Sequence, residues 1–269
     1  MNAKARALVV LNTITLLIML FVNFAGSSGV LAETTVADIS HKYDTLFAPA
    51  GYAFVIWGFL FLLAIGFVIF QWILLKHNDP KNFINRTGIW FALSNVANAS
   101  WIYLWIHQML GWSVIVIFLL LVCLIILTIR LRLELDDEPV RTIFFVWWPV
   151  TFYLGWIMVA TIACVAAWFV SFNPDPAGLT QATWTLVMIA IACVLYLGLI
   201  ISRNMREAAM VGVWAFIAIV IRQWNTHFDI AITGIIASSV LAIASLVHVF
   251  KNRYYSIGAK LKRGHWKEV

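Results

Sequence analysis

The sequence is short of charge. Charged residues make up 11% of its 269 positions, whereas hydrophobic residues make up 63%. A soluble globular domain carries about 25% charged residues, which cover its water-facing surface. A soluble enzyme, a disordered regulator and a secreted disulfide scaffold are therefore excluded. We expect an integral membrane protein in contact with the lipid bilayer.

Cysteine is scarce as well. Cys123, Cys164 and Cys193 all lie within apolar runs. They form no C-x-x-C pair and have no histidine at metal-ligand spacing, so neither a zinc site nor a disulfide framework is expected. No metal ligand and no resident cofactor are predicted.

Acids and bases are missing from the middle of every apolar run. Ionisable groups inside a membrane usually mark proton relays and ion pathways, and these are therefore disfavoured. The sequence also has no H-E-x-x-H motif, no phosphate-binding loop and no nucleophile–base set. No catalytic residue is predicted, and an enzyme is the least favoured class.

Long apolar runs are what the sequence does contain. About 20 consecutive apolar residues are needed for a helix to cross the hydrocarbon. The runs lack the alternation of a membrane barrel strand, so we predict an all-α polytopic bundle with eight transmembrane helices. The predicted spans are 7–25, 52–75, 88–107, 112–131, 142–170, 180–201, 207–223 and 229–250.

Positive charge is distributed unevenly over the ends of these spans. With eight spans, every Lys and Arg except Lys42 and Arg222 falls on one side of the membrane. Lys and Arg are retained in the cytoplasm, so both termini are predicted to be cytoplasmic. The net charge of +6 is thereby explained without a nucleic-acid partner. The expected location is the inner membrane of a bacterial cell.

The first run leaves an alternative open. Lys4 and Arg6 precede it, and Val30-Leu31-Ala32 resembles a signal-peptide cleavage site. Cleavage there would leave seven spans. The run is nevertheless longer than a typical signal-peptide core, which favours its retention as a helix.

Three parts are expected along the chain. A turn-rich break over 171–176 separates a five-helix membrane domain, 1–173, from three additional helices, 174–250. A basic cytoplasmic tail, 251–269, follows. In the last span, Gly234, Ser238 and Ala242 form a ridge of small residues that allows close helix contact. The ridge is expected to pack within the chain, with a homodimer seam as the alternative.

Polar and aromatic residues share stripes on several spans. Asn95, Asn98, Trp101 and Trp105 follow one another at helical spacing in the third span, because steps of three and four return to the same helix face. An amide in hydrocarbon needs a partner, so the two asparagines should face protein or a cavity. Two readings stay open: hydrogen bonds that join helices, and contacts to a ligand.

The stripes resemble the TspO/MBR family, the tryptophan-rich sensory proteins related to the translocator protein. The resemblance covers about 7–173. It is carried by Tyr43-x-x-Leu46-x-x-Pro49 with the following Gly51-Tyr52-Ala-Phe54 and Trp57, by Asn98-x-x-Trp101, and by Tyr153-Leu-Gly-Trp156-x3-Ala160-x7-Trp168. The chain departs from the family in three ways. The first loop has a single Pro49, Cys164 stands where the family has Asn, and three more helices follow.

The resemblance implies a ligand cavity inside the first five helices. Trp57 and Asn98 would line it, with Tyr153 and Trp156 on the opposite wall, and family ligands include porphyrins and sterol-like molecules. Flat indoles beside a hydrogen-bond donor suit such a planar, mostly apolar ligand. The predicted ligand-binding residues are Tyr52, Trp57, Asn95, Asn98, Trp101, Tyr153, Trp156 and Cys164.

The leading hypothesis is a membrane receptor or carrier that binds a planar hydrophobic small molecule, either a tetrapyrrole such as porphyrin or haem or a sterol-like lipid. A permease for a small uncharged or lipidic solute is the first alternative. A membrane enzyme that acts on a porphyrin or lipid is the second.

Overall fold

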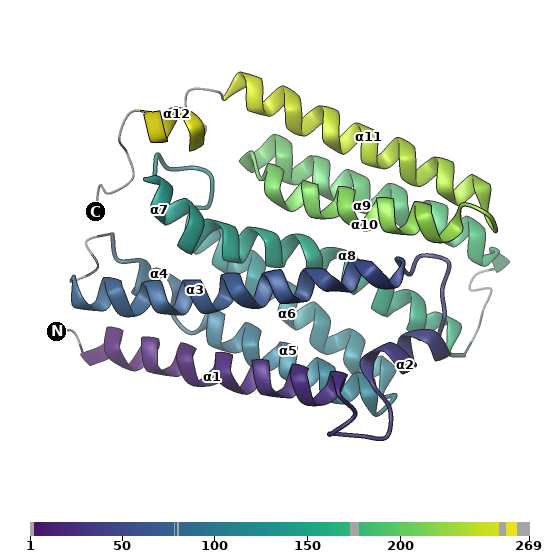
Figure 1. The fold of residues 1–269 in the computed structure, drawn as a ribbon, viewed down its shortest axis with the longest axis horizontal. Coiled ribbons are helices and arrows are strands. Elements are labelled where there is room, and N and C mark those ends of the chain that lie inside the picture. Colours follow the sequence, from purple (N-terminus) through teal and green to yellow (C-terminus); the bar gives the residue numbers. More distant parts are fainter. Residues whose placement is uncertain (1–2, 78, 80, 173–177, 253–256, 263–269) are drawn as a thin grey trace.

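The computed structural model describes residues 3–262 except 78, 80, 173–177 and 253–256 (Figure 1). All regular secondary structure in these residues is helical. Eight long helices form the body. They are α1 (Ala3–Ser27), α3 (Ile56–Lys76), α5 (Trp90–Ile106), α6 (Leu110–Arg130), α8 (Trp148–Val170), α9 (Gln181–Arg203), α10 (Arg206–Gln223) and α11 (Phe228–Lys251).

Shorter helical segments connect or extend these eight. A 3-10 turn precedes α3 and a π-helical turn precedes α8, so both helices continue beyond their α-helical bounds. The short segments are α2 (Val36–Lys42), η1 (Gly51–Val55), α4 (Phe83–Thr87), α7 (Val140–Thr142), η2 (Ile143–Trp147) and α12 (Ile257–Lys262).

Each predicted span falls on one long helix. Six helices are long and apolar enough to cross a bilayer, counting η1 with α3 and α7 and η2 with α8. The remaining two are α5, which has 17 residues, and α10, which carries Arg206, Glu207 and Arg222. The all-helical membrane architecture is confirmed, whereas the count of eight crossings and the cytoplasmic termini stay predictions.

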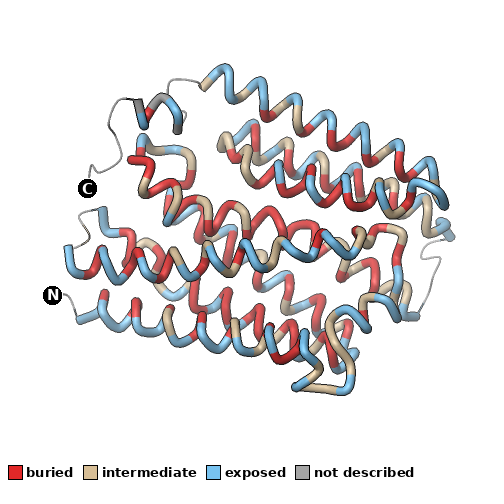
Figure 2. Tube along the Cα trace, viewed as in Figure 1, coloured by how far each residue is buried: buried red, intermediate tan, exposed pale blue. Residues whose placement is uncertain are grey.

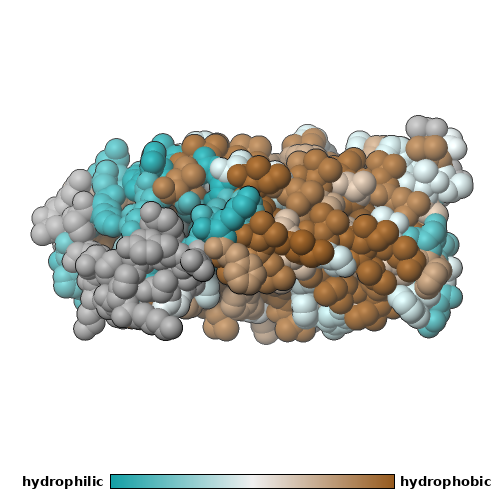
Figure 3. All heavy atoms as spheres, turned by 90° about the horizontal axis from the view of Figure 1, so that it is seen from above, coloured by the Kyte–Doolittle hydropathy of each residue, from teal (hydrophilic) through white to brown (hydrophobic). Residues whose placement is uncertain are grey.

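The helices lie side by side, and both ends of the chain lie at one end of the bundle, opposite α2 (Figure 1). Helix α8 packs on α3, α6 and α10, and α10 also packs on α9 and α11. Residues between the helices are buried and those facing outward are exposed (Figure 2). The outer surface is apolar along the middle and hydrophilic at the end near the termini (Figure 3), as a bilayer requires.

Close contact between α8 and α10 depends on Gly155. A Cβ at Gly155 would lie 2.9 Å from the carbonyl oxygen of Ala208. The hydroxyl of Tyr196, from α9, donates to the Gly155 carbonyl oxygen at 2.6 Å. Gly234 in turn lies against Val220 of α10. Gly155 and Gly234 therefore pack helices within the chain. Gly234 begins the ridge on α11, and the homodimer seam stays an untested alternative.

Helix α1 is tied to its neighbours by buried polar pairs. The Nδ2 atom of Asn23 donates to Oδ1 of Asn98 on α5 at 2.6 Å. Closer to the end of the bundle with the termini, Nδ2 of Asn95 on α5 donates to Oγ1 of Thr15 on α1 at 3.3 Å. Within hydrocarbon such pairs satisfy groups that water cannot reach, and they fix how the helices face each other.

The acidic loop between α6 and α7 is not a free, solvated loop. Glu138 is buried and accepts from Nζ of Lys81 at 2.7 Å. Nζ of Lys260, which is also buried, pairs with Asp137 at 2.6 Å, so α12 docks on this loop. The predicted boundary at 173–174 and most of the predicted basic tail, 253–256 and 263–269, lie outside the described residues.

Gly155→Ala should loosen the contact between α8 and α10. Overpacking of a close-packed contact costs about 1–3 kcal/mol, so we expect a lower melting temperature in detergent. Gly198→Ala is the matched control, because nothing lies within 4 Å of a Cβ at this exposed site on α9. Equal melting temperatures for the two variants would contradict the close packing.

The Asn23–Asn98 pair should be a measurable helix-to-helix bond. A double-mutant cycle of Asn23→Ala and Asn98→Ala, followed by unfolding in detergent micelles, should give a coupling energy of about 0.6–1.7 kcal/mol. The pair Asn23→Ala with Asn95→Ala is the control, since Asn95 bonds Thr15 instead. Strict additivity of the first pair would show that the bond does not contribute.

Candidate functional site

A cavity of about 640 Å³ opens at the end of the bundle that carries α2. Its walls come from the last turns of α1 and α5, the start of α3 with η1, and the second half of α8. The loop around α2 covers it. Residues of the wall include Asn23, Phe54, Trp57, Phe61, Trp101, Ile102, Trp105, Trp156, Ala160 and Cys164. This volume is in the range of small-molecule sites.

Indole rings make up much of the wall. Trp57 meets Trp156 edge-on, with ring centroids 6.2 Å apart and planes at 85°. Trp101 and Trp105 stack with centroids 5.4 Å apart. Spacing of four residues on one helix brings the second pair together. The first pair needs α3 and α8 to pack side by side. These rings offer flat apolar area from two directions.

Two of the indoles keep a buried donor without an acceptor among the described residues. They are Nε1 of Trp101 and Nε1 of Trp156. A buried N–H without a partner costs free energy. Both nitrogens are enclosed by protein atoms, and the Trp101 indole lies beside the Cys164 thiol. Trp105 differs, because its Nε1 donates to the Val36 carbonyl oxygen of α2 at 3.2 Å. It thus joins the wall to the loop around α2, which we call the roof.

The structure brings four of the predicted ligand residues together at the cavity: Trp57, Trp101, Trp156 and Cys164. It places the other four behind or beside this wall. Asn95 and Asn98 bond α1, and Tyr153 lies behind Trp57 with ring centroids 6.2 Å apart. Tyr52 belongs to η1 and packs against α10, with its ring centroid 5.3 Å from that of Trp214. Their ligand role stays a prediction.

The Cys164 thiol lies next to a serine hydroxyl. Its Sγ lies 3.6 Å from the Oγ of Ser113 on α6, and the side chain is buried. Among the described residues, no group of three or more His, Cys, Asp and Glu could hold a metal ion. The Cys164 thiol lies in the wall, at the distance of a weak hydrogen bond from Ser113.

The roof is an ordered loop that starts with α2. Thr35 caps α2 and donates to Asp38, and the hydrogen bonds from its amide and hydroxyl lower the pKa of the Asp38 carboxyl. Oγ1 of Thr34 donates to the Ile106 carbonyl oxygen at 2.9 Å. With the Trp105 bond, this fixes the first half of the roof to the end of α5.

The second half of the roof is held by α10. We call residues 44–50 the strap. The Ala50 amide donates to the Ala218 carbonyl oxygen at 3.1 Å, and Nε2 of Gln223 donates to the Leu46 carbonyl oxygen at 2.9 Å. Nη1 of Arg222 donates to the Ala48 carbonyl oxygen at 3.1 Å, and Arg222 also pairs with Asp44.

Sequence reasoning missed Asn23 and Arg222, which both belong to the lining. A signal existed for each. Asn23 is an amide inside an apolar run, as Asn95 and Asn98 are. Arg222 is one of only two cations that the positive-inside pattern leaves on the opposite side. An exception of that kind points to a residue with a local task.

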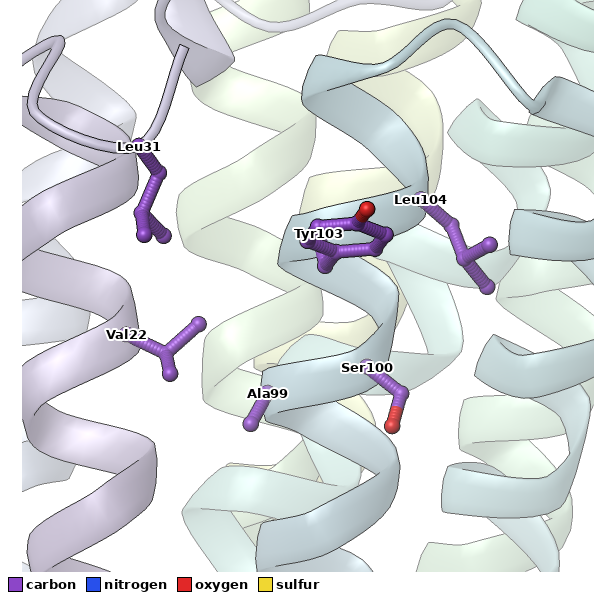
Figure 4. A pocket seen from close by; sticks show the side chains of 6 residues that line it. All are labelled: Val22, Leu31, Ala99, Ser100, Tyr103 and Leu104. Atoms are coloured by element: carbon purple, nitrogen blue, oxygen red, sulfur yellow. The ribbon is translucent and has the colours of Figure 1, made fainter.

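A second, shallow groove lies on the outer face between α1 and α5 (Figure 4). Val22 and Leu31 lie on one side of it, and the residues from α5 lie on the other. It is lined by Val22, Leu31, Ala99, Ser100, Tyr103 and Leu104, and Tyr103 is 52% exposed. Such an outward apolar groove is what lipid chains cover, so the inner cavity is the candidate site.

A family model described as TSPO-like protein matches residues 9–247. No curated protein and no solved structure matches the chain. The matched range runs from α1 to α11, and so includes the three helices that follow the five of the expected resemblance. The chain belongs to the TSPO-like protein family.

Proposed function

We propose that this protein is a membrane receptor or carrier that binds a planar hydrophobic ligand in the cavity beneath α2. The observation that carries the proposal is the wall of Trp57, Trp101, Trp105 and Trp156 around about 640 Å³. Membership of the TSPO-like family supports a membrane protein of the ligand-binding or transport type.

The chemistry of the wall supports a flat ligand with few polar atoms. Aromatic faces supply contact area, and a small number of donors fix orientation. Here the candidate donors are Nε1 of Trp101 and Nε1 of Trp156, which the wall encloses and which a ligand would reach when neighbouring side chains move. A tetrapyrrole or a sterol-like molecule has this combination of a flat apolar body and a few acceptor atoms.

The proposed topology places the cavity on the non-cytoplasmic side. Eight crossings with both termini in the cytoplasm put the end with α2 outside, because α2 lies opposite the termini (Figure 1). In a bacterium this would be the periplasmic face of the inner membrane. A ligand would then enter beneath the roof loop or laterally between helices.

A permease for a small uncharged or lipidic solute is the second candidate. The observation that favours it is the location of the cavity in a polytopic bundle, open toward one end. We propose no catalytic activity for this protein. Uptake of a solute into proteoliposomes would separate carriage across the membrane from binding alone.

Ala160→Phe should block the cavity. The added phenyl group fills space between Trp156 and Cys164, one turn away on either side. We expect the affinity for protoporphyrin IX, measured by quenching of tryptophan fluorescence in mild detergent, to fall about tenfold or more. The melting temperature should stay close to that of the wild-type protein. Ala190→Phe is the matched control, because Ala190 is exposed on the outer face of α9.

Two outcomes would contradict the proposal. One is wild-type protein whose fluorescence does not respond to protoporphyrin IX or to a sterol probe. The other is Ala160→Phe protein that binds as well as the control. Native mass spectrometry of protein purified in mild detergent gives an independent measurement, since a pigment or lipid that copurifies would reveal the ligand class directly.

A further inference from the structure

The described lining of the cavity holds a cation, Arg222, whose ion-pair partner Asp44 lies outside the lining. Among its described lining residues Arg222 carries a full charge, His41 is a titratable base, and there is no Asp, Glu or Lys. The candidate donors Nε1 of Trp101 and Nε1 of Trp156 add no negative atoms. A cleft that is lined by one sign of charge, with walls of low dielectric, concentrates its field on whatever enters.

Arg222 comes from α10, whereas the rest of the wall comes from α1, α3 with η1, α5 and α8, beneath the loop around α2. It stands in the last turn of α10, at the same end of the bundle as α2 (Figure 1). The strap bonds to Ala218, Arg222 and Gln223 hold that turn against the roof. The cation is therefore fixed at the mouth, above an apolar and aromatic interior.

The guanidinium has capacity beyond its present partners. It carries five N–H donors, and its recorded partners are the Ala48 carbonyl oxygen and Asp44. Its side chain is 27% exposed and that of Asp44 is 53% exposed. A pair between exposed groups is weak, so another carboxylate can replace Asp44 at little cost. Arginine binds carboxylates with two parallel hydrogen bonds.

We infer that Arg222 is the anion-recognition residue of this site and that the ligand is amphipathic, with a flat apolar body and a carboxylate that binds Arg222 at the mouth. The inference rests on the proposed function and adds the ligand's charge. The apolar body contacts the indoles, and the acid takes the place of Asp44 on the guanidinium. Helix α10 thereby contributes specificity to a cavity formed by other helices.

The test compares two probes that differ in one group. Pyrenebutyrate and pyrenebutanol share a flat apolar body, and only the first carries a carboxylate. Energy transfer from tryptophan to pyrene in detergent micelles reports binding. Micelles without protein give the background for each probe. In wild-type protein we expect the acid to bind about tenfold tighter than the alcohol, because a charge-assisted bond outweighs a neutral one.

Three variants decide what Arg222 does. Arg222→Gln should weaken the acid about tenfold and leave the alcohol within about twofold. Asp44→Asn should instead tighten the acid, since it removes the competing carboxylate while Arg222 keeps its charge. Arg203→Gln is the matched control: Arg203 lies at the other end of the bundle, where Nη1 donates to the Thr128 carbonyl oxygen at 3.5 Å.

The outcomes are distinct. If Arg222→Gln and Asp44→Asn weaken both probes equally, Arg222 only holds the strap and the inference is wrong. If wild-type protein binds acid and alcohol equally well, the inference is wrong and the proposed function stands. If neither probe binds wild-type protein and Ala160→Phe gives the same background signal, both the inference and the proposed function are wrong.

Discussion

The structure depends on one constraint: in hydrocarbon, each buried polar group must find its partner inside the protein. Within the helices, the backbone N–H and C=O groups bond to one another. The amides of α1 and α5 answer it for side chains, since Asn23 bonds Asn98 and Asn95 bonds Thr15. Several buried side-chain atoms among the described residues still have no partner, including Oδ1 of Asn95, Nδ2 of Asn98 and the Nε1 atoms of Trp101 and Trp156. The two indoles belong to residues of the cavity wall.

The same constraint shows which parts of the fold could be predicted. Long apolar runs located all eight long helices, because length and hydrophobicity are local properties of the sequence. Helical periodicity placed Trp101 and Trp105 on one face, and their rings stack. The resemblance placed Trp57 and Trp156 on opposite walls; both line the cavity, but their rings meet edge-on.

What could not be predicted depends on how distant segments align. Asn98 points to α1 and not into the cavity because the register between α1 and α5 sets Asn23 beside it. No local pattern contains that register. The contacts of the strap are even harder to predict, because Ala48 and Arg222 are 174 positions apart in the sequence. Only the misplaced positive charge of Arg222 marked it in advance.

The three last helices are better understood as support for the site than as an independent unit. Helix α10 packs on α8 through the narrow contact at Gly155. It also holds the strap and lies beside η1, where Tyr52 meets Trp214. The family match extends to residue 247 and so includes these helices. A bundle of the first five alone would leave the second half of the roof without its hydrogen-bond partners.

The two halves of the bundle differ in a way that favours binding over passage. The half near α2 contains the cavity, whereas the half near the termini is packed. There Phe67 lies against Phe91, with centroids 4.7 Å apart, and Asn12 bonds Gln71 at 2.9 Å. A path through this half would have to separate close-packed rings and break an amide pair within hydrocarbon. That costs dispersion contacts and leaves two amides unpaired. Holding a ligand at one end requires neither change, so this packing is consistent with the proposed binding role.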